Sequence, residues 1–419
     1  MSSPVRLTSL DTFRGLTVAA MILVNNPGSW KTIWPPLRHA SWHGCTPTDL
    51  IFPFFLFIVG VSMAMNHGKR DAVAAVNPDV GSSALHRLAI VLPRILARAA
   101  TLVALGLLLN WFGKWGFVDL RLPGVLQRIG LCYFLAAIVT EIFPRRWQWG
   151  IPLLLIAHAA VLLLIRPEPI DPTWSATLAE SANLQKLIDD AVFSPAHLYR
   201  GSKTDPEGLL GTLTALATVL IGFWCGGVIR HAVKTGAQPS AIPRLLVGGL
   251  CALVAGYATA GFPVPSGDSG WFTTSPSWAM PLNKPLWTAS YTLFTAGLGA
   301  ISLAVLFRML DVASSSPNSF RQFAVNSLDG ARAIGRNAMF VFVGSGLLAR
   351  VLAMIPAPIA IETAGKAAQR TDLKTWMFES GLSPVFGPVL ASLVFALGNV
   401  ALWVLIAIAL DRRKLYWRV

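Results

Sequence analysis

The sequence predicts an all-α polytopic membrane protein of about ten transmembrane helices with both termini in the cytoplasm. Hydrophobic residues make up 54% of the 419 residues, charged residues make up 13%, and the mean hydropathy is +0.58. A soluble domain usually has a charged fraction of about 25%. Apolar runs long enough to cross the hydrocarbon core of a bilayer recur along the whole chain. These observations exclude an ordinary soluble domain.

Ten apolar runs are long enough to be transmembrane helices. They lie near residues 14–30, 49–67, 88–110, 123–142, 148–165, 207–229, 244–262, 285–307, 334–355 and 384–410. The first run is the shortest, because Asn25, Asn26 and Pro27 end it early. An even number of spans predicts that the two termini lie on one side. We interpret residues 1–419 as a single transmembrane domain.

Charge predicts which side the termini occupy. Most Lys and Arg residues fall in the loops on the side of the N-terminus, so the positive-inside rule predicts cytoplasmic termini and an outer loop that carries His39. On a membrane protein, the formal net charge of +14 indicates loops that face anionic lipid, and it does not favour nucleic-acid binding. The chain has no N-x-S/T site and no cleavable leader pattern, which favours a multi-pass protein of a bacterial inner membrane.

Three outer segments are long enough to form a lid or the walls of a binding site, namely 166–206, 263–284 and 356–382. The first two are rich in Pro, Gly, Ser, Asp and Trp. In the third, Glu362, Lys366 and Arg370 recur every four residues, a spacing that predicts a short amphipathic helix on the membrane surface.

The strongest candidate site lies between the first two apolar runs. Asp49 stands where a Phe-rich segment enters hydrocarbon, a position that costs several kcal/mol unless the carboxylate is paired or hydrated. His39 and His43 flank Trp42 a few residues earlier. A carboxylate next to an imidazole fixes its tautomer, as a general base or an acyl-accepting histidine requires. Two alternatives remain open: interfacial polar residues beside an aromatic belt, and a zinc site with HxxxH spacing that lacks the Glu of HExxH.

Arginines within the apolar runs form a second group. Arg94 and Arg98 lie four residues apart on one helix face, and Arg128 begins the fourth run. Guanidinium groups at such positions suit a bound phosphate. The alternative is snorkelling to the interface, or an ion pair with Asp119 or Glu141.

Polar pairs at two outer helix ends form a third group. Asp205 and Glu207 occur in the sequence DPEG, and Asn283 and Lys284 occur in NKPLW. Helix capping is the alternative interpretation for Asp205 and Glu207, because Pro206 suits a first helical turn and acidic residues suit a helix N-terminus.

Several motifs in order resemble one known family. They are LDTFRG, HASWHGCTPTDLIFPFFLFIVG, LRLPGVLQRIGLCYF, DPEGLLGTL, NKPLWTASY and GRNAMFVFVG, and they run from Leu10 to about Val343. Together they resemble the heparan-α-glucosaminide N-acetyltransferase family. DPEG alone is weak, whereas the long motif around His39 combined with PGVLQR is specific.

The resemblance implies a homodimeric acyltransferase in which acetyl-CoA, as a co-substrate, acetylates the amine of a glucosamine. It implies that His39, Asp49 and Asn25 are the active-site residues. His43 stands where the lysosomal member of the family has Asn, so no catalytic role is carried onto it. We expect free glucosamine or a glucosamine-ended saccharide as the acceptor, and no metal cofactor.

The chemistry implied by the resemblance assigns the remaining candidates. We expect Arg128, Arg121, Arg94 and Gln127 to bind CoA, whose phosphates need cations, and Glu207, Asp205, Asn283, Lys284 and Trp42 to bind the sugar. The rival class is an amino-sugar transporter, in which the same ionisable residues line a substrate or proton path. The two classes differ in whether they bind acetyl-CoA: the enzyme binds it, and the transporter does not need it.

Overall fold

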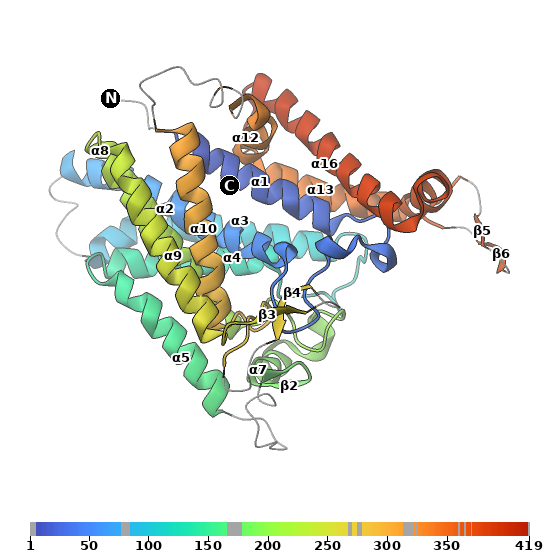
Figure 1. Ribbon diagram of the computed structural model, residues 1–419, viewed down its shortest axis with the longest axis horizontal. Helices are drawn as coiled ribbons and strands as arrows, with labels where there is room; N and C mark the ends of the chain where they lie inside the picture. The colour runs from blue at the N-terminus through green and yellow to red at the C-terminus, as the bar shows by residue number, and fades with distance from the viewer. Residues whose placement is uncertain are drawn as a thin grey trace.

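The structure is a computed structural model that describes residues 6–76, 84–165, 178–266, 270–274, 279–312, 322, 325–358, 361–363, 366–369 and 371–417. Helices dominate it (Figure 1). The long helices are α1 (Thr8–Asn25), α2 (Ile51–Val76), α3 (Ala84–Trp111), α4 (Val125–Ile142), α5 (Gly150–Leu164), α8 (Gly211–Lys234), α9 (Ala241–Thr259), α10 (Ala289–Leu310), α13 (Ala338–Met354) and α16 (Pro388–Arg412). The shorter helices are α7 (Leu184–Phe193), α12 (Asp329–Arg336), α14 (Leu373–Trp376) and α15 (Ser383–Phe386).

Within these described residues, eight helices are long and apolar enough to cross a membrane, and the bent pair α12 and α13 makes a ninth if it counts as one span. Each falls on one of the predicted apolar runs, so the helical polytopic class is confirmed. The first predicted run corresponds to α1, which begins at Thr8 and ends at Asn25 and is not among those candidate spans. The number of ten spans therefore stays a prediction.

The predicted span 334–355 is not one straight helix. Its axis turns by 88° between α12 and α13, at Asn337. The Asn337 amide is bonded to the chain near its C-terminal end: Nδ2 donates to the Leu415 carbonyl and Oδ1 accepts from the Trp417 N–H, both at 3.1 Å. These hydrogen bonds satisfy the side chain at the break and fix the end of the described chain against it.

Small residues let the helices approach closely. A Cβ atom added at Gly60 of α2 would lie 1.9 Å from the Val219 carbonyl oxygen of α8. One added at Gly222 of α8 would lie 2.1 Å from the Phe57 carbonyl oxygen of α2. Inside a bilayer, where van der Waals packing replaces the hydrophobic effect between helices, such contacts are a main source of helix association.

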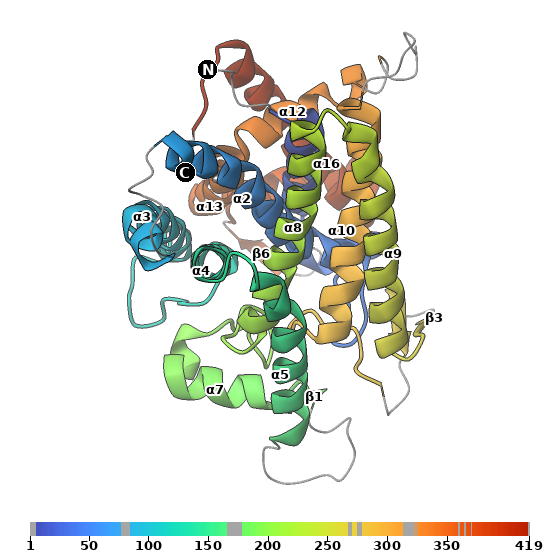
Figure 2. The same cartoon turned by 90° about the vertical axis from the view of Figure 1, so that its left-hand side faces the viewer.

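The two described ends of the chain lie side by side. The Arg6 guanidinium lies over the Tyr416 ring, 5.6 Å from its centroid. Helix α12, which packs on α1, lies at the upper end of the molecule in Figure 2, and α7 lies at the lower end. The prediction that the termini share one side is consistent with this contact, whereas their cytoplasmic location stays a prediction.

The segments that are predicted to lie on the outer side carry short secondary structure. A first hairpin pairs β1 (Leu178–Ala179) with β2 (Ala182–Asn183) and leads directly into α7. A second pairs β3 (Val264–Ser266) with β4 (Gly270–Thr274). Figure 1 shows α7, β2, β3 and β4 in the lower half of the molecule, and Figure 2 shows α7 and β3 on opposite sides of it.

The amphipathic helix predicted from Glu362 and Lys366 is wrong. Strands β5 (Ile361–Thr363) and β6 (Lys366–Gln369) form an antiparallel hairpin there, and Arg370 lies outside the described residues. The β-branched Ile361 and Thr363 favour a strand. The spacing of the charged residues was a weaker signal than these local preferences.

Candidate functional site

The loop between α1 and α2 folds back on itself and brings His39 to Asp49. It contains three short 3₁₀ helices, at Trp30–Thr32, Pro35–Leu37 and Pro47–Leu50. Two of them begin with proline, whose fixed φ suits a first helical turn. The loop therefore has a defined path even though it lacks long regular elements.

The Asp49 carboxylate is buried and fully bonded. Oδ2 accepts from the backbone N–H of Ala40 at 3.0 Å, and from the N–H and the hydroxyl of Thr46 at 3.1 and 3.0 Å. Asp49 is 1% exposed. A buried carboxylate is costly unless it is paired and hydrogen-bonded, and here one oxygen has three donors while the other is left for charged partners.

His39 is the first of those partners. Its Nδ1 lies 2.6 Å from Asp49 Oδ1, and its side chain is 47% exposed. Because a carboxylate only accepts hydrogen bonds, Nδ1 carries the proton and Nε2 carries the lone pair. Nε2 has no hydrogen-bond partner among the described residues. The pair therefore presents an oriented base at an accessible surface.

Lys284 is the second partner. Its Nζ lies 3.4 Å from Asp49 Oδ1 and 3.2 Å from His39 Nδ1. His39 Nδ1 cannot donate a hydrogen bond to Asp49 and also accept one from Lys284. The shorter contact, between His39 and Asp49, therefore assigns the tautomer, and Lys284 acts as a counterion to the carboxylate. The lysine comes from the segment just before α10, so the site joins elements far apart in the sequence.

Asn283 holds the second half of the loop. Its Nδ2 donates to the Trp42 carbonyl at 3.1 Å and to His43 Nδ1 at 3.2 Å. The Trp42 indole N–H donates to the Leu178 carbonyl at 2.9 Å, which attaches the loop to the first hairpin. Burial lowers the pKa of His43 to about 4, so this imidazole is neutral near pH 7.

Two aromatic residues beneath the loop were not predicted. Tyr291 donates from its hydroxyl to the Asp49 carbonyl at 2.5 Å. Its ring packs edge-on against Trp287, which also packs against Phe52. The Arg128 guanidinium lies over Trp287 as well, 5.2 Å from the ring centroid. The motif NKPLWTASY contains both aromatic residues, and it was the available signal.

Arg121, Asp205 and Glu207 form a separate group, which we name the Arg121 cluster. Arg121 Nη2 lies 2.7 Å from Asp205 Oδ1 and 2.5 Å from Glu207 Oε2. Burial opposes the charge, but the two carboxylates outweigh it and raise the pKa of Arg121. Asp205 also accepts from the N–H groups of Tyr199 and Glu207 at 2.8 and 2.9 Å. The cluster fastens the 112–124 loop to the chain before α8.

Gln127 and Arg128 leave buried donors unused. Arg128 Nη2 donates to the Gly208 carbonyl at 2.6 Å, but its Nε and Nη1 have no partner among the described residues. The same holds for Gln127 Nε2. Unpaired buried donors are rare in native proteins, which makes this a place where an acceptor such as water or a ligand oxygen is expected.

Asn25 and Arg94 are not joined to these groups. Asn25 is the last residue of α1 and is exposed, and Arg94 is exposed on α3. Among the described residues, neither has a hydrogen bond or ion pair with His39 or Asp49. The part of the chain that the structure describes also contains no group of three His, Cys, Asp or Glu side chains able to hold a metal ion.

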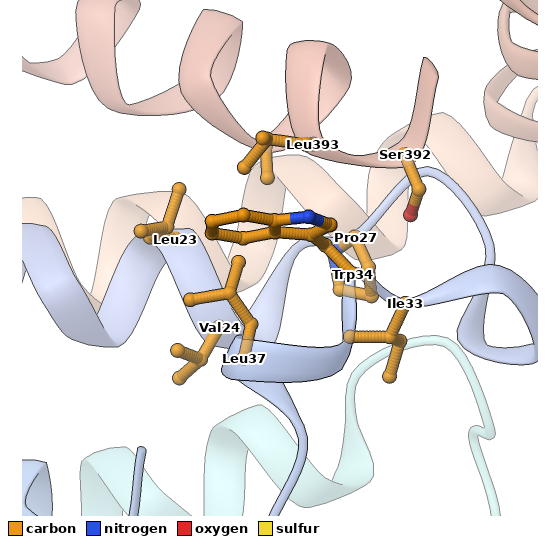
Figure 3. A pocket seen from close by; sticks show the side chains of 9 residues that line it. Leu23, Val24, Pro27, Ile33, Trp34, Leu37, Ser392 and Leu393 are labelled. Atoms are coloured by element: carbon orange, nitrogen blue, oxygen red, sulfur yellow. The ribbon is translucent and has the colours of Figure 1, made fainter. Parts of the chain in front are cut away.

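An apolar hollow lies beside the same loop. The Trp34 indole lies among Leu23, Leu37 and Leu393, between the end of α1 and α16 (Figure 3). Ser392 of α16 accepts from the Ser29 N–H at 3.3 Å at its edge. These contacts pack α16 against the loop that carries His39.

Known proteins match this chain over the region that contains the site. The sequence model described as heparan-alpha-glucosaminide N-acetyltransferase, catalytic, matches residues 6–189. The chain is 25% identical to the heparan-alpha-glucosaminide N-acetyltransferase of Mus musculus, over all of this chain and 61% of that protein. The Homo sapiens protein of the same name is also 25% identical, over 99% of this chain and 60% of its own length. The chain thus spans about three fifths of each of these relatives.

Fold and site together define a multi-pass helical membrane protein with a His–Asp pair in the loop before its second helix. The matches support a likeness to the heparan-alpha-glucosaminide N-acetyltransferase family, the same family that the sequence motifs resemble.

Proposed function

We propose that the protein is a membrane-bound acetyltransferase that moves an acetyl group from acetyl-CoA to the amine of glucosamine or of a glucosamine-ended saccharide. The names of the two relatives support N-acetylation of a glucosaminide. One observation carries the proposal: the 2.6 Å contact between His39 and Asp49, with an accessible Nε2 that has no partner among the described residues. A transporter has no need for an imidazole with this fixed tautomer.

The reaction needs a neutral amine. The amine nitrogen attacks the thioester carbonyl carbon, a C–N bond forms, and the C–S bond breaks as the CoA thiolate leaves. His39 Nε2 accepts the proton that the amine loses, and Asp49 stabilises the resulting imidazolium through Nδ1–H. A route in which Nε2 first takes the acetyl group uses the same orientation, and both routes remain within the proposal.

Acetyl-CoA is the proposed source of the acetyl group. Its phosphates need hydrogen-bond donors or cations that are not already engaged. Gln127 and Arg128 fit this need best, since both have buried N–H groups without a partner among the described residues. Arg94 is exposed and available on α3. Arg121 would have to bind phosphate beside two carboxylates, so we rank it last of the four.

The acceptor sugar is proposed to bind around the exposed face of His39. Three of the predicted sugar-binding residues belong to the group of contacts around His39 and His43, namely Lys284, Asn283 and Trp42. Lys284 would also counter the charge of Asp49. Asp205 and Glu207 stay predictions for sugar contacts. Asn25 stays the predicted donor to the thioester oxygen as negative charge develops there. It would have to approach the site when substrate is bound.

We further propose a multi-pass protein of a bacterial inner membrane that works as a homodimer. Helix α3 supports an association or lipid-facing role, because little of its surface is buried within one chain. One transmembrane domain, lined on its outer side by 166–206, 263–284 and 356–382, would hold both substrates.

The test is acetyl transfer from radiolabelled acetyl-CoA to glucosamine by purified protein in detergent, with wild type beside His39→Ala. We expect labelled N-acetylglucosamine from wild type only. The His39 side chain is about half exposed and Lys284 remains beside Asp49, so the variant should keep the thermal unfolding midpoint of wild type. Product formed equally by both would remove His39 from the mechanism. Failure of wild type to bind acetyl-CoA would instead favour the transporter.

A further inference from the structure

His43 is a second imidazole in the same loop, and its tautomer can be assigned from its neighbours. The buried Asn283 amide faces three groups. Its Oδ1 accepts from the Leu286 N–H at 2.7 Å, and its Nδ2 donates to the Trp42 carbonyl at 3.1 Å. A backbone N–H can only donate and a carbonyl can only accept, so these two neighbours fix the amide in one orientation.

The fixed amide determines the proton on His43. Asn283 presents an N–H to His43 Nδ1 at 3.2 Å, so Nδ1 accepts and neutral His43 carries its hydrogen on Nε2. Burial lowers the pKa of His43 to about 4, and protonation of Nδ1 would set two donors against each other. His43 is therefore an uncharged N–H donor near neutral pH.

The two imidazoles of the loop have opposite roles. His39 has its hydrogen on Nδ1, directed to Asp49, and presents a lone pair at Nε2. His43 accepts at Nδ1 and presents an N–H at Nε2. Consecutive residues hold them, since Lys284 contacts His39 and Asn283 contacts His43. Both imidazoles therefore lie against the same two consecutive residues, Asn283 and Lys284.

The His43 donor is not used within the described part of the chain. Nε2 has no hydrogen-bond partner among those residues, and it is not one of the polar atoms sealed from solvent. The neighbouring polar groups show the contrast, because Asn283 and the Trp42 indole N–H are satisfied. A neutral donor held in one orientation beside an oriented base is suited to a ligand oxygen.

We propose that His43 binds substrate by donating a hydrogen bond from Nε2 to an oxygen of the reacting pair. This inference rests on the proposed acetyl transfer and adds a residue to its site. The oxygen belongs to the sugar or to the thioester carbonyl. A donor to the sugar strengthens ground-state binding, whereas a donor to the thioester oxygen acts mainly as charge develops in the transition state.

The test compares His43→Phe, which has no donor, with His43→Gln, whose amide N–H can reach the position of Nε2, in the acetyl-transfer assay. If the sugar oxygen is the acceptor, His43→Phe raises the KM for glucosamine about tenfold with kcat unchanged. If the thioester oxygen is the acceptor, kcat falls about tenfold and both KM values stay. His43→Gln should recover most of the loss in either case. The exposed His231→Phe on α8 is the matched control.

Equal kinetics in wild type and His43→Phe would overturn the inference while leaving the acetyltransferase intact. A Gln variant as poor as the Phe variant, at an equal unfolding midpoint, would also overturn it. A readout independent of turnover is ¹⁵N NMR of histidine-labelled protein, with the His43 signals identified by their loss in His43→Gln. We expect protonated Nε2, unprotonated Nδ1 and a shift of Nε2 on adding glucosamine or acetyl-CoA. Protonated Nδ1, or no shift with either substrate, would contradict the assignment even if wild type made no product.

Discussion

The pair His39 and Asp49 and the Arg121 cluster contain similar groups at the same end of the molecule, but their bonding differs. In the first, a buried carboxylate orients an imidazole whose outer nitrogen has no partner among the described residues. In the second, a guanidinium lies between two carboxylates, and Asp205 receives two backbone N–H groups as well. One group keeps a reactive atom available, and the other uses its charges to join two segments of the chain.

This difference separates chemistry from architecture better than residue type does. Both groups combine acids and bases near a helix end, and they look alike in the sequence. A catalytic group needs an accessible atom in a fixed protonation state, whereas a structural ion pair is stable when no donor or acceptor is left over. Substitutions in the two groups should therefore affect different measured quantities.

The largest effect is expected from Asp49→Asn. Three donors face Oδ2, so the substituted amide would keep its oxygen there, turn its nitrogen toward His39 and favour the opposite imidazole tautomer. We expect kcat for acetyl transfer to fall by about 10²- to 10⁴-fold. Initial rates with saturating acetyl-CoA and glucosamine measure it.

The matched comparison is the double variant His39→Ala with Asp49→Asn. Residues that act as one unit show strongly non-additive losses, so the double variant should be about as slow as the slower single variant. Multiplicative losses would mean that the two side chains act independently, and the 2.6 Å contact would then not be the basis of the mechanism.

The next effect is expected from Arg121→Met, and it concerns stability. Removing the guanidinium leaves two buried carboxylates without their cation, which typically costs about 3–5 kcal/mol. Thermal unfolding in detergent measures the loss. The triple variant Arg121→Met, Asp205→Asn and Glu207→Gln should recover part of it, because the charges of the cluster are then all removed.

The same variant tests the role in CoA binding that the sequence suggested for Arg121. A normal unfolding midpoint together with a raised KM for acetyl-CoA would support phosphate binding and would contradict the structural assignment. A lowered midpoint with the KM unchanged in the folded fraction would keep the distinction between the two groups.

Sequence patterns were informative where the interaction is local. Apolar runs predicted the long helices, and the ten-residue separation of His39 and Asp49 made their contact a reasonable expectation in a loop that returns to the membrane. The structure also has a capping box at Thr46 and Asp49, a local pattern that the sequence analysis did not use. These features depend on residues within a few turns of each other.

Long-range pairing could not be predicted. Arg121 meets Asp205 across 84 positions and Tyr291 meets the Asp49 carbonyl across 242, and no local spacing encodes either contact. The bend at Asn337 depends on hydrogen bonds to Leu415 and Trp417, which lie far along the chain. Tertiary partners also decide whether an arginine is available. The guanidinium of Arg121 is paired, whereas that of Arg128 keeps buried donors without a partner among the described residues.

The smallest effect is expected at Asp189, which borders the Arg121 cluster. Unlike the carboxylates of the cluster, this carboxyl group is not fully hydrogen-bonded. Its Oδ1 accepts from the Leu209 N–H at 2.8 Å, but its buried Oδ2 has no partner among the described residues. Burial raises the pKa of Asp189 to about 6, so folding favours the protonated carboxyl group, and this contribution to stability is lost as pH rises through about 6.

The variant Asp189→Asn cannot ionise. We expect it to be more stable than wild type at pH 8, by about 1–2 kcal/mol, and equal to wild type near pH 4. Unfolding midpoints at both pH values measure this, with Asp190→Asn as the control, since Asp190 pairs with Lys186 at 2.7 Å. A gain that is the same at both pH values would show that the neutral side chain, and not the lost charge, stabilises the fold.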